Sequence, residues 1–377
     1  MGGTAMRTIS AVTTCAAALG IAFALLGCSS RPPSGTYQPI GEARLENFRV
    51  TGPYTHANLH VFLIHSESQE DGEFLTLDEG LKKGLVVITE KEQSTVSELV
   101  IENQSDLPLF LQEGDRLYGG KQDRIIYASI IIPPKSGKMT VPAFCIEPGR
   151  WSPDRHGMRF VATDNSALAP RAVRNAAKIA KDQGAVWNNV RQIQVAFQNS
   201  YNTRTTTSSL NEVQEHPEVA KACEEYTAAL SKVLDDKTDV VGVAIAVGGR
   251  LEEVNVYPNY RLLKRMYPRL IQSYVPQAAF QQRKDQSAEP PTCEDVVKFL
   301  TQGKPRSTRS ETINADNRLE VVTLEFAGQA DQFAKCTTSF RDKTIHLQHL
   351  RIDPQELKHD RSFDNDIRQQ RPIDNDF

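Results

Sequence analysis

Residues 111–124 read LQEGDRLYGGKQDR and run into an apolar segment that predicts a strand. The adjacent glycines Gly119 and Gly120 let a ligand or another stretch of backbone approach closely, because glycine has no Cβ. The four residues after them supply a cation, an amide, a carboxylate and a guanidinium, which suits a polar or anionic small molecule. The first candidate binding residues are therefore Lys121, Gln122, Asp123 and Arg124.

A regular strand would not bring these four side chains to one ligand. Alternation along a strand puts Lys121 and Asp123 on one face, and Gln122 and Arg124 on the other. All four face one ligand only if the backbone bends. The alternative interpretation, which spacing alone favours, is a polar turn whose Asp and Arg pair with neighbouring groups.

Residues 141–151 read VPAFCIEPGRW and place a cysteine among charged neighbours. A nucleophilic Cys145 needs a lowered thiol pKa, which a cation such as Arg150 supplies. Against this role, strand alternation places Cys145 on the same face as Val141 and Ala143. That position favours a buried structural thiol.

The pattern of apolar residues predicts an α+β fold. Short apolar runs alternate with turn signals over residues 45–150, which indicates a β-rich N-terminal unit. A run at 125–132 is expected to be one of its strands. One short helix interrupts the strands at 77–83, where Thr76 and Glu79 have the spacing of a capping box.

The second part, residues 151–352, is expected to be mostly helical, because apolar residues recur there at helical spacing. Two apolar runs joined by a Gly-Gly turn predict a β-hairpin over 240–257. Two further runs, 319–326 and 344–352, are expected to be closing strands. Residues 45–352 are therefore expected to form a single domain.

The N-terminus has the layout of a lipoprotein signal peptide over residues 1–27. Arg7 precedes an apolar run at 11–26, which ends in Leu-Leu-Gly before Cys28. This lipobox-like ending predicts that Cys28 carries a diacylglyceryl anchor and that the protein faces the periplasm or the exterior. An uncleaved signal anchor is the alternative, since the apolar run approaches the length of about 18 residues that suggests a membrane span.

Two polar segments flank the expected domain. Residues 28–44 contain proline and glycine with little apolar surface to bury, so they are expected to form a flexible tether. Residues 353–377 are dominated by Asp, Arg, Gln and Asn, and we expect them to be a disordered tail.

Composition and missing motifs narrow the function classes. A net charge of -3 without a run of Lys or Arg argues against nucleic acid as a partner. The sequence has no H-E-x-x-H and no C-x-x-C, so no metal is expected. No dinucleotide, P-loop or serine-hydrolase pattern occurs either, so no cofactor is expected, and whether the protein is an enzyme stays open.

Four cysteines remain once the signal is removed and Cys28 is lipidated, and their spacing singles out no disulfide pairing. Separate buried thiols are the alternative, since buried cysteine behaves as a small hydrophobe. The four are Cys145, Cys223, Cys293 and Cys336.

Several segments together resemble the ARG and rhodanese-phosphatase superfamily associated protein domain, a bacterial family without a settled activity. The resemblance covers residues 45–352 and departs from the family at Asn255, where an Asp is usual. The family's title implies a link to ADP-ribose or phosphoryl metabolism in some members. The matching segments are LTLDEGL at 75–81, GGKQDR at 119–124, VPAFCIEPGRW at 141–151, QGAVW at 183–187 and LIQSY at 270–274.

The resemblance also implies that eight residues of two segments surround one site. These are Lys121, Gln122, Asp123, Arg124, Cys145, Glu147, Arg150 and Trp151.

Three functional hypotheses follow. The preferred one is a membrane-tethered binding or accessory module in which Lys121, Gln122 and Arg124 hold a polar or anionic ligand, since Arg suits bidentate contact with carboxylate or phosphate. The second is an envelope hydrolase acting on ADP-ribose- or phosphate-containing substrates, using Cys145 or a carboxylate pair of Glu113 and Asp123. The third is an interaction scaffold without a small-molecule site, whose protein partners the sequence does not identify.

Overall fold

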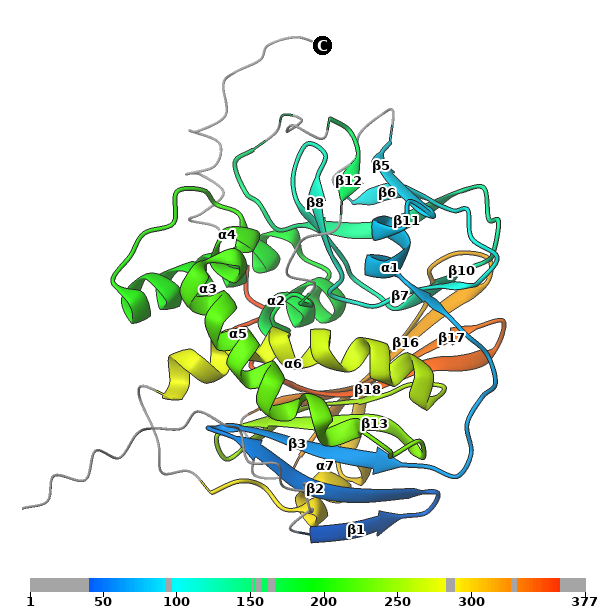
Figure 1. Ribbon diagram of the computed structural model, residues 1–377, viewed down its shortest axis with the longest axis vertical. Coiled ribbons are helices and arrows are strands. Elements are labelled where there is room, and N and C mark those ends of the chain that lie inside the picture. The colour runs from blue at the N-terminus through cyan, green and yellow to red at the C-terminus, as the bar shows by residue number, and fades with distance from the viewer. Residues whose placement is uncertain are drawn as a thin grey trace, which may run out of the picture. The chain divides into compact units, whose positions relative to one another are not determined.

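An antiparallel sheet of nine strands forms the base of the fold, and both ends of the described chain contribute to it (Figure 1). The computed structural model describes residues 41–91, 97–150, 152, 157–161, 167–282, 289–326 and 331–359. In spatial order the nine strands are β1 (Gly41–Leu45), β2 (Phe48–His56), β3 (Leu59–His65), β13 (Val240–Val247), β14 (Arg250–Val256), β18 (Lys343–Ile352), β17 (Gln332–Phe340), β16 (Asn317–Glu325) and β15 (Lys304–Thr312).

Two smaller sheets are built from the part of the chain between β3 and β13. The first has six antiparallel strands: β12 (Phe160–Val161), β8 (Arg116–Gly119), β9 (Arg124–Ile126), β11 (Lys138–Cys145), β6 (Glu98–Asn103) and β5 (Val86–Glu90). The second has three strands, with β4 parallel to β7: β10 (Ile130–Ile132), β7 (Leu109–Leu111) and β4 (Leu75–Thr76).

Helices cover both faces of the nine-stranded sheet. In Figure 1, α5 and α6 lie over β3 and β13, while α7 lies near β1 and β2. No helix among the described residues is long and apolar enough to cross a membrane. The helices are α1 (Leu77–Lys82), α2 (Arg171–Asn175), the π-helix η1 (Ala176–Ala180), α3 (Gln183–Tyr201), α4 (Leu210–Glu215), α5 (Pro217–Leu230), the 3-10 helix η2 (Ser231–Leu234), α6 (Tyr260–Gln282) and α7 (Cys293–Thr301).

Strand β3 shows why the sheet is covered on both sides. Its residues are all buried, and successive side chains point to opposite faces. Val61 and Leu63 pack in the core under α5 and α6, whereas Phe62 and Ile64 pack with α7. Burying one such side chain contributes about 1.5–3 kcal/mol, so a strand that is apolar on both faces is stable only between two layers.

The α+β class is confirmed, and so are several predicted elements. The capping box at α1 forms, and the amide of Thr76 donates to Oε2 of Glu79 at 3.1 Å. The predicted hairpin is β13 and β14. The part expected to be mostly helical also contributes β13 to β18 to the nine-stranded sheet, so it holds more strand than its apolar periodicity indicated.

The single strand expected over 125–132 is wrong. The chain forms β9 and β10 there, and these belong to different sheets. Ser129 lies between them, where its hydroxyl accepts a hydrogen bond from the amide of Glu113 at 3.1 Å and bonds His346 Nδ1 at 2.8 Å. Ser129, a polar residue with buried hydrogen-bond partners, therefore divides the apolar run at 125–132 into two strands.

The folded domain extends beyond the expected range of 45–352 at both ends. Strand β1 includes the last four residues of the segment expected to be a tether, and it pairs with β2 along its length. Beyond β18, Glu356 forms an ion pair with Arg171 at 2.7 Å, so the start of the expected tail is packed against α2. The rest of the tether and tail, and the signal segment at 1–27, lie outside the described residues.

Gly114 is required by the packing of a buried arginine. Its φ is +86°, and a Cβ built on it would lie 2.3 Å from Cδ of Arg174. Gly137 has a similar positive φ of +63°, but a Cβ there would meet nothing within 4 Å. A side chain at Gly137 would therefore cause backbone strain alone, whereas one at Gly114 would cause both backbone strain and a steric clash.

We predict that Gly114→Ala lowers the free energy of unfolding by at least about 3 kcal/mol, because the added methyl displaces a buried charged side chain. Gly137→Ala serves as the matched control and should cost about 1 kcal/mol, the backbone strain alone. Urea unfolding measures both values. Equal losses in the two variants would contradict the role given to Gly114.

Candidate functional site

The backbone bends sharply at the glycine pair before the first candidate residues. Gly119 has φ +123° and Gly120 has φ +57°. A Cβ on Gly119 would lie 2.5 Å from the carbonyl oxygen of Arg159, and one on Gly120 would lie 2.4 Å from the ring of Phe160. The glycines thus allow the close approach of the chain at β12, which is the backbone alternative raised by the sequence.

Asp123 lies at the centre of the bend, and both of its carboxylate oxygens accept hydrogen bonds. Oδ1 accepts from the amide of Gly119 at 3.0 Å, and Oδ2 accepts from Ser209 Oγ and Asn211 Nδ2, both at 2.8 Å. Burial raises the pKa of Asp123, and the nearby charge of Glu147 raises it further. The carboxylate therefore ties the loop to the segment that begins α4.

Arg150 acts as a clamp on the same loop. Its guanidinium donates to Glu147 Oε2 at 2.8 Å and to the carbonyl oxygen of Gly120 at 2.9 Å, and Nη2 lies 3.3 Å from Asp123 Oδ1. The amide of Asp123 donates to Glu147 Oε2 at 3.1 Å. Arg150 therefore links its own segment to the loop.

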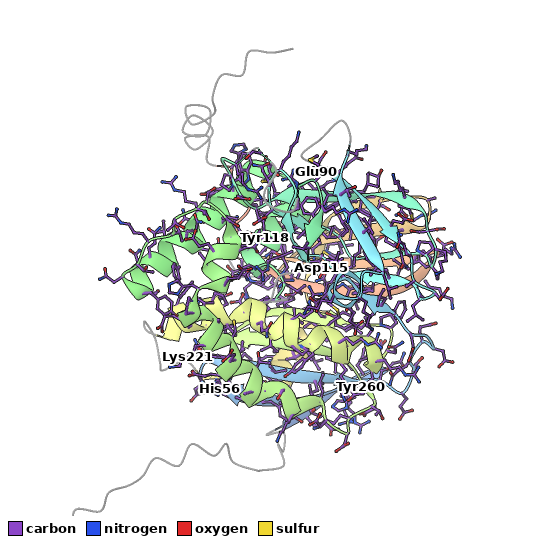
Figure 2. The ribbon with its side chains drawn as sticks, turned by 45° about the horizontal axis from the view of Figure 1, so that its top comes forward. His56, Glu90, Asp115, Tyr118, Lys221 and Tyr260 are labelled. Carbon is purple, nitrogen blue, oxygen red and sulfur yellow. The ribbon has the colours of Figure 1, made fainter. Side chains whose placement is uncertain are left out.

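Gln122 and Arg124 are buried and point inward. Gln122 Nε2 donates to the carbonyl oxygen of Glu147 at 2.8 Å. Arg124 is fully buried and donates to Gln122 Oε1 at 3.2 Å and to Glu90 Oε1 at 3.3 Å. Figure 2 shows Glu90 in the part of the molecule built on the six-stranded sheet. The amide of Lys121 also donates to Glu90, at 3.1 Å.

The cysteine prediction that is supported is the structural one. Cys145 is fully buried, and burial raises the pKa of its thiol to about 11, although the charge of Arg124 opposes this. Such a thiol is protonated at neutral pH and does not fit a nucleophile. The other three cysteines in the described domain are also buried and free of disulfides: Cys223, Cys293 and Cys336.

The structure therefore brings together most of the predicted site residues, but it uses them to hold one another. Trp151 lies outside the described residues. Glu113 belongs to a different cluster. Gln122 and Arg124, which were expected to hold a ligand, are buried and bonded to neighbouring groups, and their binding of a ligand stays a prediction. The residues brought together are Gln122, Asp123, Arg124, Cys145, Glu147 and Arg150.

Glu113 lies in a second cluster around Arg174, near the middle of the domain. Arg174 donates to Glu113 Oε1 at 2.7 Å and to both carboxylate oxygens of Glu253, at 2.9 and 2.6 Å. The Tyr274 hydroxyl donates to Glu253 as well. Although burial alone would raise it, the charge of Arg174 holds the pKa of Glu253 at about 2. The cluster therefore stays ionised.

The cluster extends through η1 to the nine-stranded sheet. Lys178, in this π-helix, donates to Gln348 Oε1 at 2.6 Å and lies 3.3 Å from Glu113 Oε2. Gln348 Nε2 and His346 Nε2 both bond Oδ1 of Asn255, each at 3.0 Å. Asn255 is thus part of the buried cluster, and its Nδ2 has no hydrogen-bond partner among the described residues.

A cavity of about 360 Å³ opens beside this cluster, between α2, α3, α6 and the turn after β18. Its volume lies within the range of roughly 300–1,000 Å³ that is usual for small-molecule sites. Ile193, Pro276 and Phe280 give it an apolar wall. Arg171 and Glu252 give it a charged floor, one residue or one helical turn from members of the Arg174 cluster.

The charged floor is incompletely bonded. Arg171 Nε and Glu252 Oε2 lie 3.2 Å apart, but they are not aligned for a hydrogen bond and neither has another hydrogen-bond partner among the described residues. Arg171 also donates to Glu356 Oε1 at 2.7 Å. Both residues are nearly buried, at 7% and 2% exposure. Groups with unused bonding capacity at the floor of a cavity can bind a ligand.

Sequence reasoning missed Arg171, Arg174, Glu252 and Glu253. The available signal was the pair of glutamates within the apolar hairpin at 240–257, since a strand flanked by apolar runs is buried and its charges need partners. The partners themselves lie far away in the chain, so spacing could not identify them.

No group of three or more His, Cys, Asp or Glu side chains able to hold a metal ion occurs in the part of the chain that the structure describes. The fold and these two clusters define a mixed α+β domain organised around buried ion pairs. The chain belongs to the family of the ARG and Rhodanese-Phosphatase-superfamily-associated Protein domain, ARPP-1, whose model matches residues 47–350. Comparison with curated proteins gives no match, and comparison with solved structures gives none either.

His346 makes the stability of the domain depend on pH. Burial, together with the charge of Lys178, lowers its pKa to about 3 in the folded state. The unfolded chain binds a proton at about 6.5, so the stability that the neutral ring contributes is present above this pH and is lost as the pH falls.

We predict that the wild-type protein loses about 2 kcal/mol more than His346→Gln between pH 7 and pH 5, since the variant cannot take up the proton on unfolding. Urea unfolding at the two pH values measures the difference. The half-buried His56→Gln is the control for removing a histidine elsewhere. Parallel pH profiles of wild type and His346→Gln would show the assignment to be wrong.

Proposed function

We propose that this protein is a membrane-tethered lipoprotein of the cell envelope whose domain binds a small polar ligand in the cavity above Arg171 and Glu252. The carrying observation is the pairing of an apolar wall with buried charged atoms that keep unused hydrogen-bonding capacity. Ligand sites combine mostly apolar walls with a few placed polar groups, and this cavity has that composition.

This proposal moves the ligand away from the loop at 119–124. The polar groups of that loop bond to one another and to Glu147, Ser209 and Asn211, so a ligand would have to break buried hydrogen bonds to bind there. Each such bond leaves a buried group unpaired when it is lost, at a cost of about 1–3 kcal/mol. A ligand can enter the cavity without breaking these bonds, because other residues line it.

The hydrolase alternative receives no support from the residues expected to carry it. The thiol of Cys145 is buried with a raised pKa. Glu113 bonds Arg174 and Gln348, whereas Asp123 bonds Ser209 and Asn211, so the two carboxylates belong to separate clusters. The scaffold alternative relied on an exposed 119–124 surface, and most of that segment is buried.

The lipid anchor is proposed from the sequence, because Leu-Leu-Gly precedes Cys28 at the end of an apolar run. We expect intact-mass and peptide mass spectrometry of the membrane-extracted protein to show a mature chain that starts at an acylated Cys28. Cys28→Ser should abolish both the lipid and the processing. A mature protein that keeps residues 1–27, or begins without an acyl group, would refute the tether.

The ligand site is tested by filling the cavity. We predict that a metabolite panel containing ADP-ribose, sugar phosphates, amino acids and amines yields a compound that raises the melting temperature of the wild-type domain. Ala196→Phe should weaken its binding at least tenfold, because Ala196 lines the cavity and the added ring occupies it. Val195→Phe is the matched control, since Val195 is exposed and does not line the cavity.

Two outcomes would contradict the proposal. One is a panel that gives no thermal shift at any concentration. The other is a ligand whose affinity is the same in wild type, Ala196→Phe and Val195→Phe, since such a ligand would bind elsewhere on the protein.

A further inference from the structure

We propose that the ligand of the cavity is a cation, namely an amine or guanidinium carried on an apolar body. This inference rests on the proposed binding function and adds the sign of the ligand's charge. The observation behind it is the excess of carboxylate over cationic side chains around the cavity.

Three carboxylates and two guanidiniums line the cavity: Glu252, Asp353, Glu356, Arg171 and Arg250. Arg250 contributes little to the interior, because its side chain is 55% exposed and pairs with Asp331 at 3.1 Å, outside the lining. Within the cavity the carboxylates therefore face one cation.

Arg171 is already committed to the protein. It donates to the carbonyl oxygen of Arg351 at 2.6 Å and to both carboxylate oxygens of Glu356, at 3.2 and 2.7 Å. Two carboxylates, those of Glu252 and Glu356, face the single positive charge of Arg171. Their negative charge is therefore only partly neutralised. An anionic ligand would meet this excess negative charge at short range and would be repelled.

Glu252 offers the acceptor for the ligand's donor. Its Oε1 accepts from Gln277 Nε2 at 3.1 Å, while Oε2 lies beside Arg171 without an aligned hydrogen bond. A carboxylate oxygen accepts more than one hydrogen bond, and an ammonium has three donors and no acceptor. Because Oε2 is buried beneath the cavity surface, an amine in the cavity would interact with the Glu252 carboxylate through its charge.

The electrostatics of Glu356 agree with this assignment. Burial raises its pKa, and the charges of Glu252 and Asp353 raise it further, while Arg171 and the Asn175 side chain oppose the rise. A cation in the cavity would stabilise the charged form of Glu356. The apolar wall on the other side suits an aliphatic or aromatic body.

Three compounds with one body and different charges test the inference on the full-length protein. Tyramine is the cation, 4-ethylphenol the neutral compound, and 3-(4-hydroxyphenyl)propionate the anion. Isothermal titration calorimetry at pH 7.5 should give the order tyramine, 4-ethylphenol, propionate from tightest to weakest, with about tenfold between the cation and the neutral compound.

Two variants remove the negative charge while keeping the side-chain shape. Asp353→Asn and Glu252→Gln should each lower the affinity for tyramine about three- to tenfold and leave 4-ethylphenol unchanged. Asp353 is the safer position, because it lies in the turn after β18 and is not part of the buried floor. Glu98→Gln, an exposed change in the six-stranded sheet, is the matched control and should alter neither affinity.

The outcomes separate this inference from the binding function beneath it. Tighter binding of the propionate than of tyramine would overturn the charge assignment and leave the cavity as the ligand site. Equal affinity of tyramine for wild type, Asp353→Asn and Glu252→Gln would overturn it as well. Binding of none of the three compounds would also reject it, and the Ala196→Phe comparison would then decide separately whether the cavity binds anything.

Discussion

The rest of the structure depends on the ion pairs that the buried Arg174 forms with two glutamates. It joins Glu113 from the turn before β8 to Glu253 in the hairpin, and Lys178 and Gln348 extend the cluster to β18. Two charges taken out of water are stable only when each is paired and hydrogen-bonded, and removing one partner costs about 3–5 kcal/mol. The helix, the small sheets and the large sheet are therefore held in one arrangement by charges that have no other way to be satisfied.

This constraint also explains the order of the polar residues at 111–124. Glu113 contacts Arg174, Gly114 leaves room for it, and Asp115 pairs with Arg269 on α6 at 2.7 Å. Farther along, Asp123 fixes the bend to the start of α4. One short stretch thus docks the small sheets onto three helices. Its polar side chains serve assembly, whereas the cavity beside Arg171 is open to a ligand.

Much of the fold could be predicted because apolar periodicity reports which face of an element is buried. The hairpin at 240–257 and the capping box at Thr76 and Glu79 are local patterns, and both formed. Strand β15 was missed, since its sequence KPRSTRSET has no apolar face and it is held through backbone pairing with β16. The family resemblance placed the segments around Asp123 and Glu147 together, and these two residues are hydrogen-bonded to each other. The pairing of Glu113 with Arg174, 61 residues apart, could not be read from spacing.

The polar character of β15 has a consequence for the protein in solution. An open sheet leaves a row of unpaired backbone groups at its edge, where a second molecule can add a strand and begin a fibril. Pro305 lacks an amide hydrogen to offer, and the neighbouring Lys304 and Arg306 would set like charges against each other in any copy that docked side by side. A strand that contributes little to the hydrophobic interior thereby keeps a large sheet from assembling with itself.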